Sequence, residues 1–271
     1  MITSLKPLPM SKILVLLFIL IGPCFQASTG YECTMSGMTY YPLQKEISLN
    51  PQILIQGYAM DQKTIRGFEK LPPYLETESG EKVMLKLLNI NEGQMSITQA
   101  TFKPVSSLKP NTEYYLNFQR AKQNEKEDPT RYNSDKKERE RIVWSTTNTE
   151  DLKSLDSEPE LNFEETNVEF YGCGPAANAI FNIKNTKGQE IWYQTEFIDL
   201  ETGKSSTYIL HPWEGKLYVG HGMCSGAFTY AKTGKYKVRF TPMNIDGETS
   251  DTTEWFTYES PFVGEESPWG F

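Results

Sequence analysis

Histidine and cysteine are scarce in this chain, which has two histidines and four cysteines among 271 residues. It has no Gly-x-Ser-x-Gly, His-Glu-x-x-His or phosphate-binding glycine motif. Because His211 and His221 are ten residues apart, a catalytic triad would need its other members to converge on one short region. We therefore expect no enzyme. A hydrolase that uses carboxylates alone stays open as an alternative, since Asp and Glu together number 35.

Positive charge is also in deficit, with 27 Lys and Arg against 35 Asp and Glu and a formal net charge of −8. An acidic balance argues against nucleic acid or anionic membrane surfaces as general partners. The chain contains no Asn-x-Ser/Thr site for N-glycosylation. Beyond the first thirty residues no apolar run is long enough to cross a bilayer, so we expect no transmembrane segment in the mature chain.

Residues 1–30 have the three-part pattern of a secretory signal peptide. Lys6 and Lys12 precede an apolar run over 13–21, and small residues follow it. A membrane anchor is disfavoured because the run is about half of the roughly 20 residues needed to span a bilayer. Cleavage after Thr29 or Gly30 would remove two positive charges and change the formal charge from −8 to −10. The pattern predicts a secreted or cell-envelope protein, periplasmic or on the extracellular surface.

The cysteines are consistent with an oxidising compartment. Cys24 follows the apolar run as a lipid-attachment cysteine would, but Pro23 stands where a lipobox has a small residue, which disfavours lipidation. Cys33, Cys173 and Cys224 remain after cleavage, so one disulfide and one thiol are the simplest count. Three pairs are possible, and we favour Cys173 with Cys224 because both lie in the second half of the chain.

From Tyr41 onward, short runs of β-branched and aromatic residues alternate with polar ones between turn signals, a pattern typical of half-buried strands. A charged stretch, 120–141, holds eight basic and six acidic residues and interrupts the first half. We interpret it as a solvated hairpin tip, with a docking loop as the alternative. Asp246 to Glu248 predict a Gly-containing hairpin turn, with a calcium site as the alternative.

The acidic segment 149–161 is poor in large apolar residues and predicts a linker. It separates a first domain, 31–148, from a second, 162–260, and a flexible tail is expected over 261–271. Each domain has the length of a sandwich of about seven short strands. The fold class we predict is all-β, with two tandem antiparallel β-sandwich domains after the signal peptide.

Part of the first domain resembles a known pattern. Leu108-x-Pro110-x-Thr112-x-Tyr114, followed by alternating apolar positions, is similar to the tyrosine-corner region of fibronectin type III domains. With Asn50-Pro51-x-Ile53 upstream, the domain also resembles bacterial Ig-like repeats of secreted surface proteins. In the second domain, Tyr236-x-Val238-x-Phe240 and Asp246-Gly247-Glu248-x-Ser250 look like the last hairpin of the same kind of domain. The resemblance implies an Ig-like sandwich and an extracellular spacer, adhesion or recognition role, although this fold alone fixes no function.

One region concentrates the candidate site residues. His211 and His221 lie near Met223 and Cys224, which are residue types that copper or zinc binds. A metal site of His211, His221 and Cys224 is one hypothesis, and two ordinary loop histidines are the favoured interpretation. Trp213 follows Pro212 in an expected loop and is the tryptophan most suited to an exposed position, where it could stack on a sugar ring. Trp192 and Trp255 are expected to fill the core.

The function we predict is a secreted, non-catalytic, Ig-like protein acting as a surface or periplasmic interaction or structural module. Its partner would be a protein or a glycan at the cell envelope, and no cofactor is expected. The alternative is a carbohydrate- or metal-binding module that uses Trp213, His211 and His221.

Overall fold

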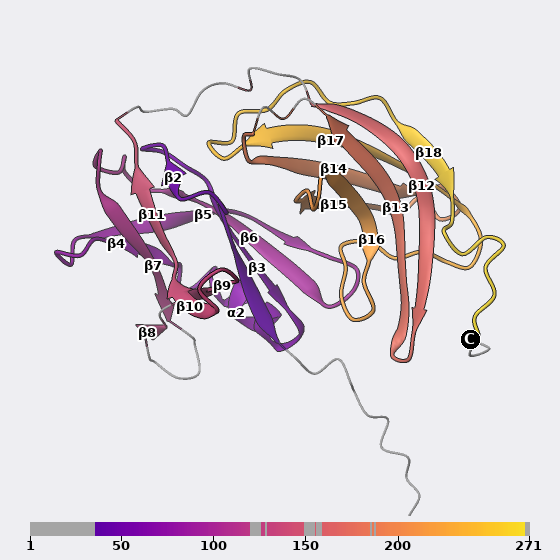
Figure 1. The fold of residues 1–271 in the computed structure, drawn as a ribbon, viewed down its shortest axis with the longest axis horizontal. Helices are drawn as coiled ribbons and strands as arrows, with labels where there is room; N and C mark the ends of the chain where they lie inside the picture. The colour runs from indigo at the N-terminus through magenta and orange to yellow at the C-terminus, as the bar shows by residue number, and fades with distance from the viewer. Residues whose placement is uncertain are drawn as a thin grey trace, which may run out of the picture. The chain divides into compact units, whose positions relative to one another are not determined.

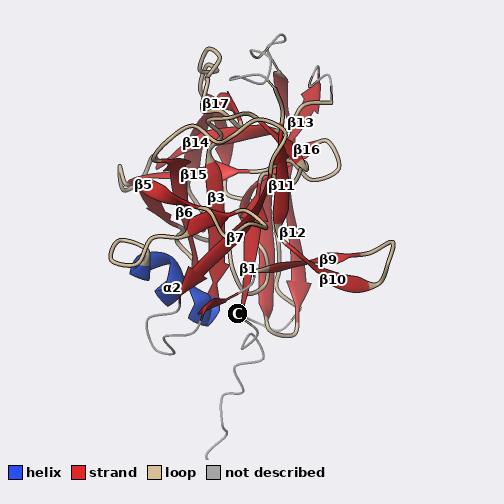
Figure 2. Ribbon diagram, turned by 90° about the vertical axis from the view of Figure 1, so that its left-hand side faces the viewer, coloured by secondary structure: helices blue, strands red, loops and turns tan. Residues whose placement is uncertain are grey.

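The computed structural model describes residues 36–119, 126–127, 129–148, 155, 159–184, 186 and 188–268. Within it, Met35–Phe271 forms one compact unit. Strands dominate this unit, so the predicted all-β fold class is confirmed (Figure 2). The predicted signal peptide and Cys33 lie outside the described residues, as does most of the predicted linker. The domain boundaries therefore stay predictions.

The N-terminal strand group runs from β1 to β11 and is coloured indigo to rose in Figure 1. Its elements are β1 (Gly37–Tyr41), β2 (Glu46–Ile47), β3 (Ile53–Tyr58), the 3-10 turn η1 (Ala59–Asp61), α2 (Gln62–Gly67), β4 (Tyr74–Glu76), β5 (Lys82–Glu92), β6 (Ile97–Pro104), β7 (Glu113–Gln119), β8 (Lys126–Glu127), β9 (Thr130–Asn133), β10 (Glu138–Arg141) and β11 (Val143–Thr146).

One continuous sheet path joins most of this group in the order β1-β3-β6-β5-β4-β7-β11-β2. Strand β5 is long enough to serve two neighbours, because its first residues pair with β4 and the rest pair with β6 across a bulge between Leu87 and Asn89. The path therefore wraps around a core that includes Ile55, Phe102, Phe118 and Trp144. All pairings on it are antiparallel except β2 with β11.

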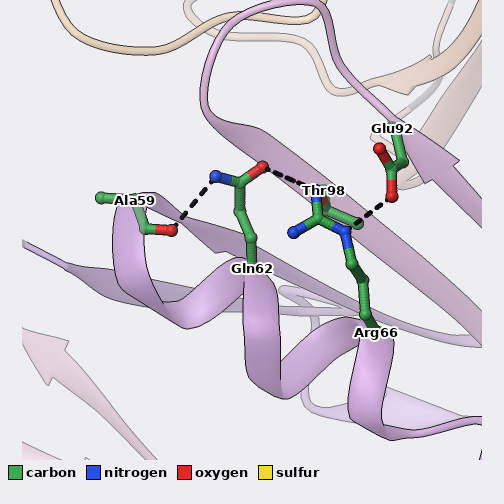
Figure 3. Close-up of polar contacts among 5 residues, drawn as sticks. All are labelled: Ala59, Gln62, Arg66, Glu92 and Thr98. Carbon is green, nitrogen blue, oxygen red and sulfur yellow. Dashed lines mark hydrogen bonds and ion pairs between the residues drawn. The ribbon is translucent and has the colours of Figure 1, made fainter.

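Helix α2 is short and is held on the sheet by polar side chains (Figure 3). The guanidinium of Arg66 contacts the carboxylate of Glu92 at 2.6 Å, and Thr98 donates to the side-chain oxygen of Gln62 at 3.0 Å. Gln62 in turn donates to the carbonyl of Ala59 at 3.1 Å. Both ion-pair partners are about half exposed, so the pair adds little stability and chiefly orients the helix.

The C-terminal strand group contains two sheets with the orders β12-β13-β16 and β15-β14-β17-β18 (orange to yellow in Figure 1). A second core cluster, which includes Phe181, Leu217, Phe197 and Phe240, draws residues from both sheets. The strands are β12 (Glu160–Tyr171), β13 (Gly174–Lys184), β14 (Ile191–Asp199), β15 (Ser205–Leu210), β16 (Lys216–His221), β17 (Lys235–Asn244) and β18 (Phe256–Glu259).

Both strand groups contain the same tyrosine hydrogen bond. The hydroxyl of Tyr114 accepts the backbone N–H of Lys109 at 2.9 Å, and that of Tyr236 accepts the N–H of Ala231 at 2.8 Å. In each case the amide lies five residues upstream of a buried tyrosine at the start of a strand. A tyrosine hydroxyl bonded to the backbone a few residues upstream is typical of tyrosine corners. The bond occurs at Tyr114, in the stretch that resembles a tyrosine-corner region, and again at Tyr236.

The described part of the charged stretch forms the hairpin of β9 and β10 and is largely exposed, as predicted. Arg131 departs from that interpretation. Its half-buried guanidinium donates to the carbonyls of Tyr40, Pro42 and Leu43 at 2.5, 3.1 and 3.1 Å. One residue of the hairpin therefore anchors the end of β1 and the segment that follows it.

Two further predictions have mixed outcomes. The turn at Asp246–Glu248 is a hairpin turn, since Asn244 N–H donates to Glu248 O at 2.9 Å and Gly247 has a φ of +88°. Trp255, however, does not fill the core. It is partly exposed, and the cationic groups of Lys237 and Arg239 lie 4.5 and 4.6 Å from its ring centroid.

No helix within the described ranges is long and apolar enough to cross a membrane.

Candidate functional site

The sheet β15-β14-β17-β18 is apolar on both faces over part of its area. In β14, Ile191 and Tyr193 belong to the C-terminal core, whereas Trp192 between them belongs to the N-terminal core. Ile209 of β15 and Met243 of β17 join Trp192 there. Because successive strand residues point to opposite faces, the second face is covered by the N-terminal strand group. We call this contact region the junction.

Hydrogen bonds across the junction are specific. The carboxylate of Glu190 accepts the backbone N–H groups of Leu43 and Gln44 at 2.7 and 2.8 Å, and its other oxygen accepts the indole N–H of Trp192 at 2.9 Å. The buried amide of Gln99 pairs with the backbone of Ile209, accepting its N–H at 2.9 Å and donating to its carbonyl at 3.1 Å. Such bonds satisfy polar groups that would otherwise be costly to bury.

Glycines let the two strand groups approach closely at one edge of the junction. Met95 and Gly226 exchange backbone hydrogen bonds of 3.1 and 2.8 Å. A Cβ on Gly93 would lie 2.9 Å from the carbonyl oxygen of Gly226, and one on Gly226 would lie 2.2 Å from the Cα of His221. No other residue type has room at these positions, so the backbone contact itself requires glycine.

An aromatic group lies at the middle of the junction. The ring of Tyr41 stacks on the imidazole of His211, and Trp192 meets both rings edge-on, with centroids 6.4 Å from Tyr41 and 5.6 Å from His211. Burial lowers the pKa of His211 to about 3, so this imidazole is neutral at pH 7. Burial, with a smaller contribution from the charge of Glu190, raises the pKa of Tyr41 to about 12.

Two cavities share Tyr41 and His211 as part of their walls. The first, about 240 Å³, is lined also by Gln56, Asn178, Tyr218 and His221, and we call it the histidine cavity. The second, about 260 Å³, is lined also by Leu43, Ile183, Glu190 and Pro212, and we call it the Leu43 cavity. Both lie where residues of the two strand groups meet, which is a common position for binding sites.

The structure brings together His211 and His221, which the sequence could only place in one region. Both line the histidine cavity. Cys224 does not complete a metal site with them: among the described residues, no three His, Cys, Asp or Glu side chains are grouped as ligands. The hypothesis of a copper or zinc site therefore gains no support from the geometry.

A tight turn accounts for the residues between His221 and Gly226. Gly222 N–H donates to the carbonyl of Ser225 at 2.9 Å, and a single bridge pairs His221 with Gly226. The imidazole Nδ1 of His221 is 2.9 Å from the carbonyl of Gly222, which can only accept, so Nδ1 carries the proton. Small and turn-forming residues are thus needed here for backbone reasons.

Trp213 is exposed, as predicted, with 62% of its surface accessible. It lies in the turn between β15 and β16, where Trp213 and Lys216 exchange backbone hydrogen bonds of 2.9 and 3.0 Å. It does not line the histidine cavity, but its ring centroid is 5.7 Å from that of Tyr218, which does. Its neighbour Pro212 lines the Leu43 cavity.

Cys173 lies exposed in the turn between β12 and β13, and Cys224 lies in the turn after β16. These turns are neighbours, because a Cβ on Gly174 would lie 3.7 Å from the carbonyl oxygen of Met223. The pairing of Cys173 with Cys224 stays a prediction, and peptide mapping under non-reducing conditions distinguishes it from the two pairs that include Cys33.

Sequence reasoning missed several residues that build this region, including Tyr41, Glu190, Gln99 and Arg131. Their contacts join segments far apart in the chain, such as Glu190 with Leu43, which are 147 residues apart. No local pattern reports such a pairing. The scarcity of histidine was the one usable signal, and it pointed to two residues that line the histidine cavity.

Comparisons with known proteins add little. No protein-family model matches the chain, and no curated protein does. Among solved structures, pullulanase from Anoxybacillus sp. LM18-11 aligns with 9% identity and a TM-score of 0.25, covering 82% of this chain and 25% of that one. The same enzyme complexed with maltotriose aligns with 8% identity and a TM-score of 0.24, covering 78% of this chain and 24% of that one. The chain therefore spans about a quarter of the pullulanases' length.

A chain of a cytokine receptor complex, crystal form 1A, aligns with 8% identity and a TM-score of 0.25, covering 83% of this chain and 97% of that one. At TM-scores this low, none of these likenesses carries a conclusion about function.

Proposed function

We propose that this chain is a secreted, non-catalytic protein of two Ig-like β-sandwich modules that acts by binding another protein at the cell envelope. The proposal combines the signal-peptide pattern of residues 1–30 with the tyrosine corners of Tyr114 and Tyr236. In this role the two modules act as one body, because Trp192, Ile209 and Met243 of the second are buried in the core of the first.

The observation that carries the binding role is an exposed tryptophan beside an apolar cavity. The Leu43 cavity is walled largely by apolar groups, including Ile183, Ile191 and Pro212. Leu43 itself is 50% exposed, and Trp213, next to Pro212 in the chain, is 62% exposed. Protein interfaces concentrate their binding energy in tryptophan, tyrosine and arginine anchors that surround or fill such pockets. A partner's apolar side chain would enter the cavity while Leu43 and Trp213 pack around it.

Site-specific photo-crosslinking tests this surface. A photoreactive phenylalanine replaces Trp213 in the secreted chain, and the same residue replaces Val105, which is 61% exposed elsewhere, as the control. We expect a discrete crosslinked protein from position 213 in native envelope material and none from position 105. Leu43→Asp should abolish the product by placing a charge beside the apolar cavity. Equal labelling from both positions, or labelling that survives Leu43→Asp, would refute the docking surface.

The compartment has its own test. Intact-mass measurement of the protein recovered outside the cytoplasm should show a chain that begins near Tyr31, with residues 1–30 removed. Retention of the full-length chain in the cytoplasm would remove the basis for an envelope partner. This result would leave the cavities themselves unaffected.

A further inference from the structure

The histidine cavity is bordered by both strand groups and opens to solvent. Its walls come from β1, β3 and β6 on one side and from β13, β15 and β16 on the other. Among the described residues that line it there is no Asp, Glu, Lys or Arg. His211 adds no charge at neutral pH, because burial lowers its pKa to about 3. The described lining therefore favours a neutral ligand, because it offers no carboxylate, ammonium or guanidinium group to pair with an ionic one.

Polar groups nevertheless line the walls. The imidazole of His211 forms part of the wall, although its Nε2 atom is fully buried and, among the described residues, has no hydrogen-bond partner. In His221 the proton sits on Nδ1, which leaves Nε2 as an acceptor. The side chains of Gln56 and Asn178 add amide groups, and each amide has both a donor and an acceptor.

Tyrosine rings supply the apolar part of the lining. Tyr41, Tyr208 and Tyr218 each contribute to the wall. The hydroxyl of Tyr208 donates to the side-chain oxygen of Gln56 at 3.2 Å, which joins the two strand groups across the cavity and fixes both side chains. Aromatic rings with fixed polar groups between them suit a ligand that has apolar faces and a polar edge.

We propose that the histidine cavity binds a neutral, polyhydroxylated ligand of the size of a single sugar ring. Hydroxyl groups both donate and accept, so they match the Nε2 acceptor of His221 and the amide groups together. A volume of about 240 Å³ lies just below the usual range of ligand pockets, roughly 300–1,000 Å³, and so favours one ring over an oligosaccharide. A free monosaccharide and the terminal residue of a glycan share this chemistry, and the experiment below distinguishes them. This site does not depend on the protein partner proposed above.

Nuclear magnetic resonance titration of the purified chain tests the proposal. The probes are glucose, galactose, mannose and N-acetylglucosamine, with glucuronate and glucosamine as charged comparators. We expect saturable shifts of the imidazole resonances of His211 and His221 with at least one neutral sugar at millimolar concentration, and weaker shifts with its charged analogue. A second arm uses oligosaccharides that end in the sugar that binds. Tighter binding of these identifies a glycan terminus, and equal or weaker binding identifies the free sugar.

Variants locate the site. His221→Gln and Tyr218→Ala should each weaken binding by at least about tenfold, which corresponds to about 1.4 kcal/mol. Tyr132→Ala is the matched control, since Tyr132 is 57% exposed on β9 and does not line the cavity. Thermal melts check that each variant folds. The proposal fails if no neutral sugar shifts either histidine in the wild-type chain, if the charged analogues bind better, or if folded variants bind like the wild type.

Discussion

The ring of Tyr41 lies parallel to the imidazole of His211, with centroids 3.5 Å apart and an angle of 11° between their planes. One residue ends β1 and the other follows β15, so this stacked pair joins the two strand groups. Around it, Trp192 closes the edge and Glu190 ties the backbone of Leu43 and Gln44 to the second group. The junction therefore contributes to the walls of both the histidine cavity and the Leu43 cavity.

Acid should destabilise the protein through His211. Its pKa is lowered from 6.5 to about 3 by burial, so the unfolded chain binds this proton more readily than the folded chain between those values. Stability from this group is fully present above pH 6.5 and is lost as the pH falls through the window, by at most about 1.4 kcal/mol per pH unit. We expect the free energy of urea unfolding of His211→Phe to depend less on pH than that of the wild type between pH 6.5 and the acid end of this window. Parallel profiles for the two proteins would contradict a buried neutral imidazole.

Replacing Glu190 should loosen the junction. Glu190→Gln keeps the shape of the side chain but removes the charge and one acceptor, while three N–H donors still need partners. Hydrogen bonds to a charged group contribute about 1.5–3 kcal/mol, so a loss of about 2 kcal/mol is expected. Chemical denaturation measures it, with Glu113→Gln at an exposed position of β7 as the control. Equal effects of the two substitutions on the free energy of unfolding would show that the hydrogen bonds of Glu190 do not stabilise the junction.

Removing the tyrosine hydroxyl should destabilise the protein to a similar extent at both tyrosine corners. Tyr114→Phe leaves the N–H of Lys109 without its acceptor, and Tyr236→Phe does the same to Ala231. Each should lower the free energy of unfolding by about 1–2 kcal/mol, because an unsatisfied amide remains. Tyr115→Phe, next to the first corner and stacked on Arg141, should change little. A corner substitution without effect would mean that its hydrogen bond is replaced by water.

Tyr193→Phe, unlike the two corner substitutions, should not lower the free energy of unfolding. The hydroxyl of Tyr193 is buried in the C-terminal core and has no hydrogen-bond partner in the part of the chain that the structure describes. Burial raises the pKa of this phenol far above its usual value. Removing an unsatisfied buried hydroxyl should leave stability unchanged or raise it by up to about 1 kcal/mol. The melting temperatures of Tyr193→Phe and Tyr236→Phe, compared under the same conditions, give the contrast directly. A clear loss on Tyr193→Phe would indicate an ordered water on that hydroxyl.

The sequence predicted those parts of the molecule that depend on neighbours along the chain. Alternating residues such as Tyr236, Val238 and Phe240 predicted strands, and the residues before Tyr114 resembled a tyrosine-corner region. The exposure of Trp213 was also predictable from its expected loop. Trp192 shows the limit. The alternation of residues along a strand does not show which of its faces will be covered. Trp192 is buried in the core of the N-terminal strand group, and this depends on how the two strand groups pack.

The site was harder to predict because its residues have ordinary neighbours. His211 and His221 drew attention as rare residues, and their proximity to Cys224 in sequence suggested a metal site as an alternative to two ordinary loop histidines. The structure places both in the wall of one cavity with Tyr41, Gln56 and Tyr208. Glu190 and Arg131 are single charges among many in the sequence. Their roles become visible only when the backbone groups they bind are brought to them by folding.

The shared core has a consequence for how the chain is made. Trp192, Ile209 and Met243 complete the core that contains Phe102 and Trp144, yet they are synthesised after it. Since chains emerge from the ribosome N-terminal end first, the first half appears before the residues that cover its apolar face. That apolar face of the nascent chain therefore stays uncovered until the second half has been synthesised. Holding chaperones would have their longest opportunity to bind during this interval, and a prematurely terminated chain would be the product most prone to aggregate.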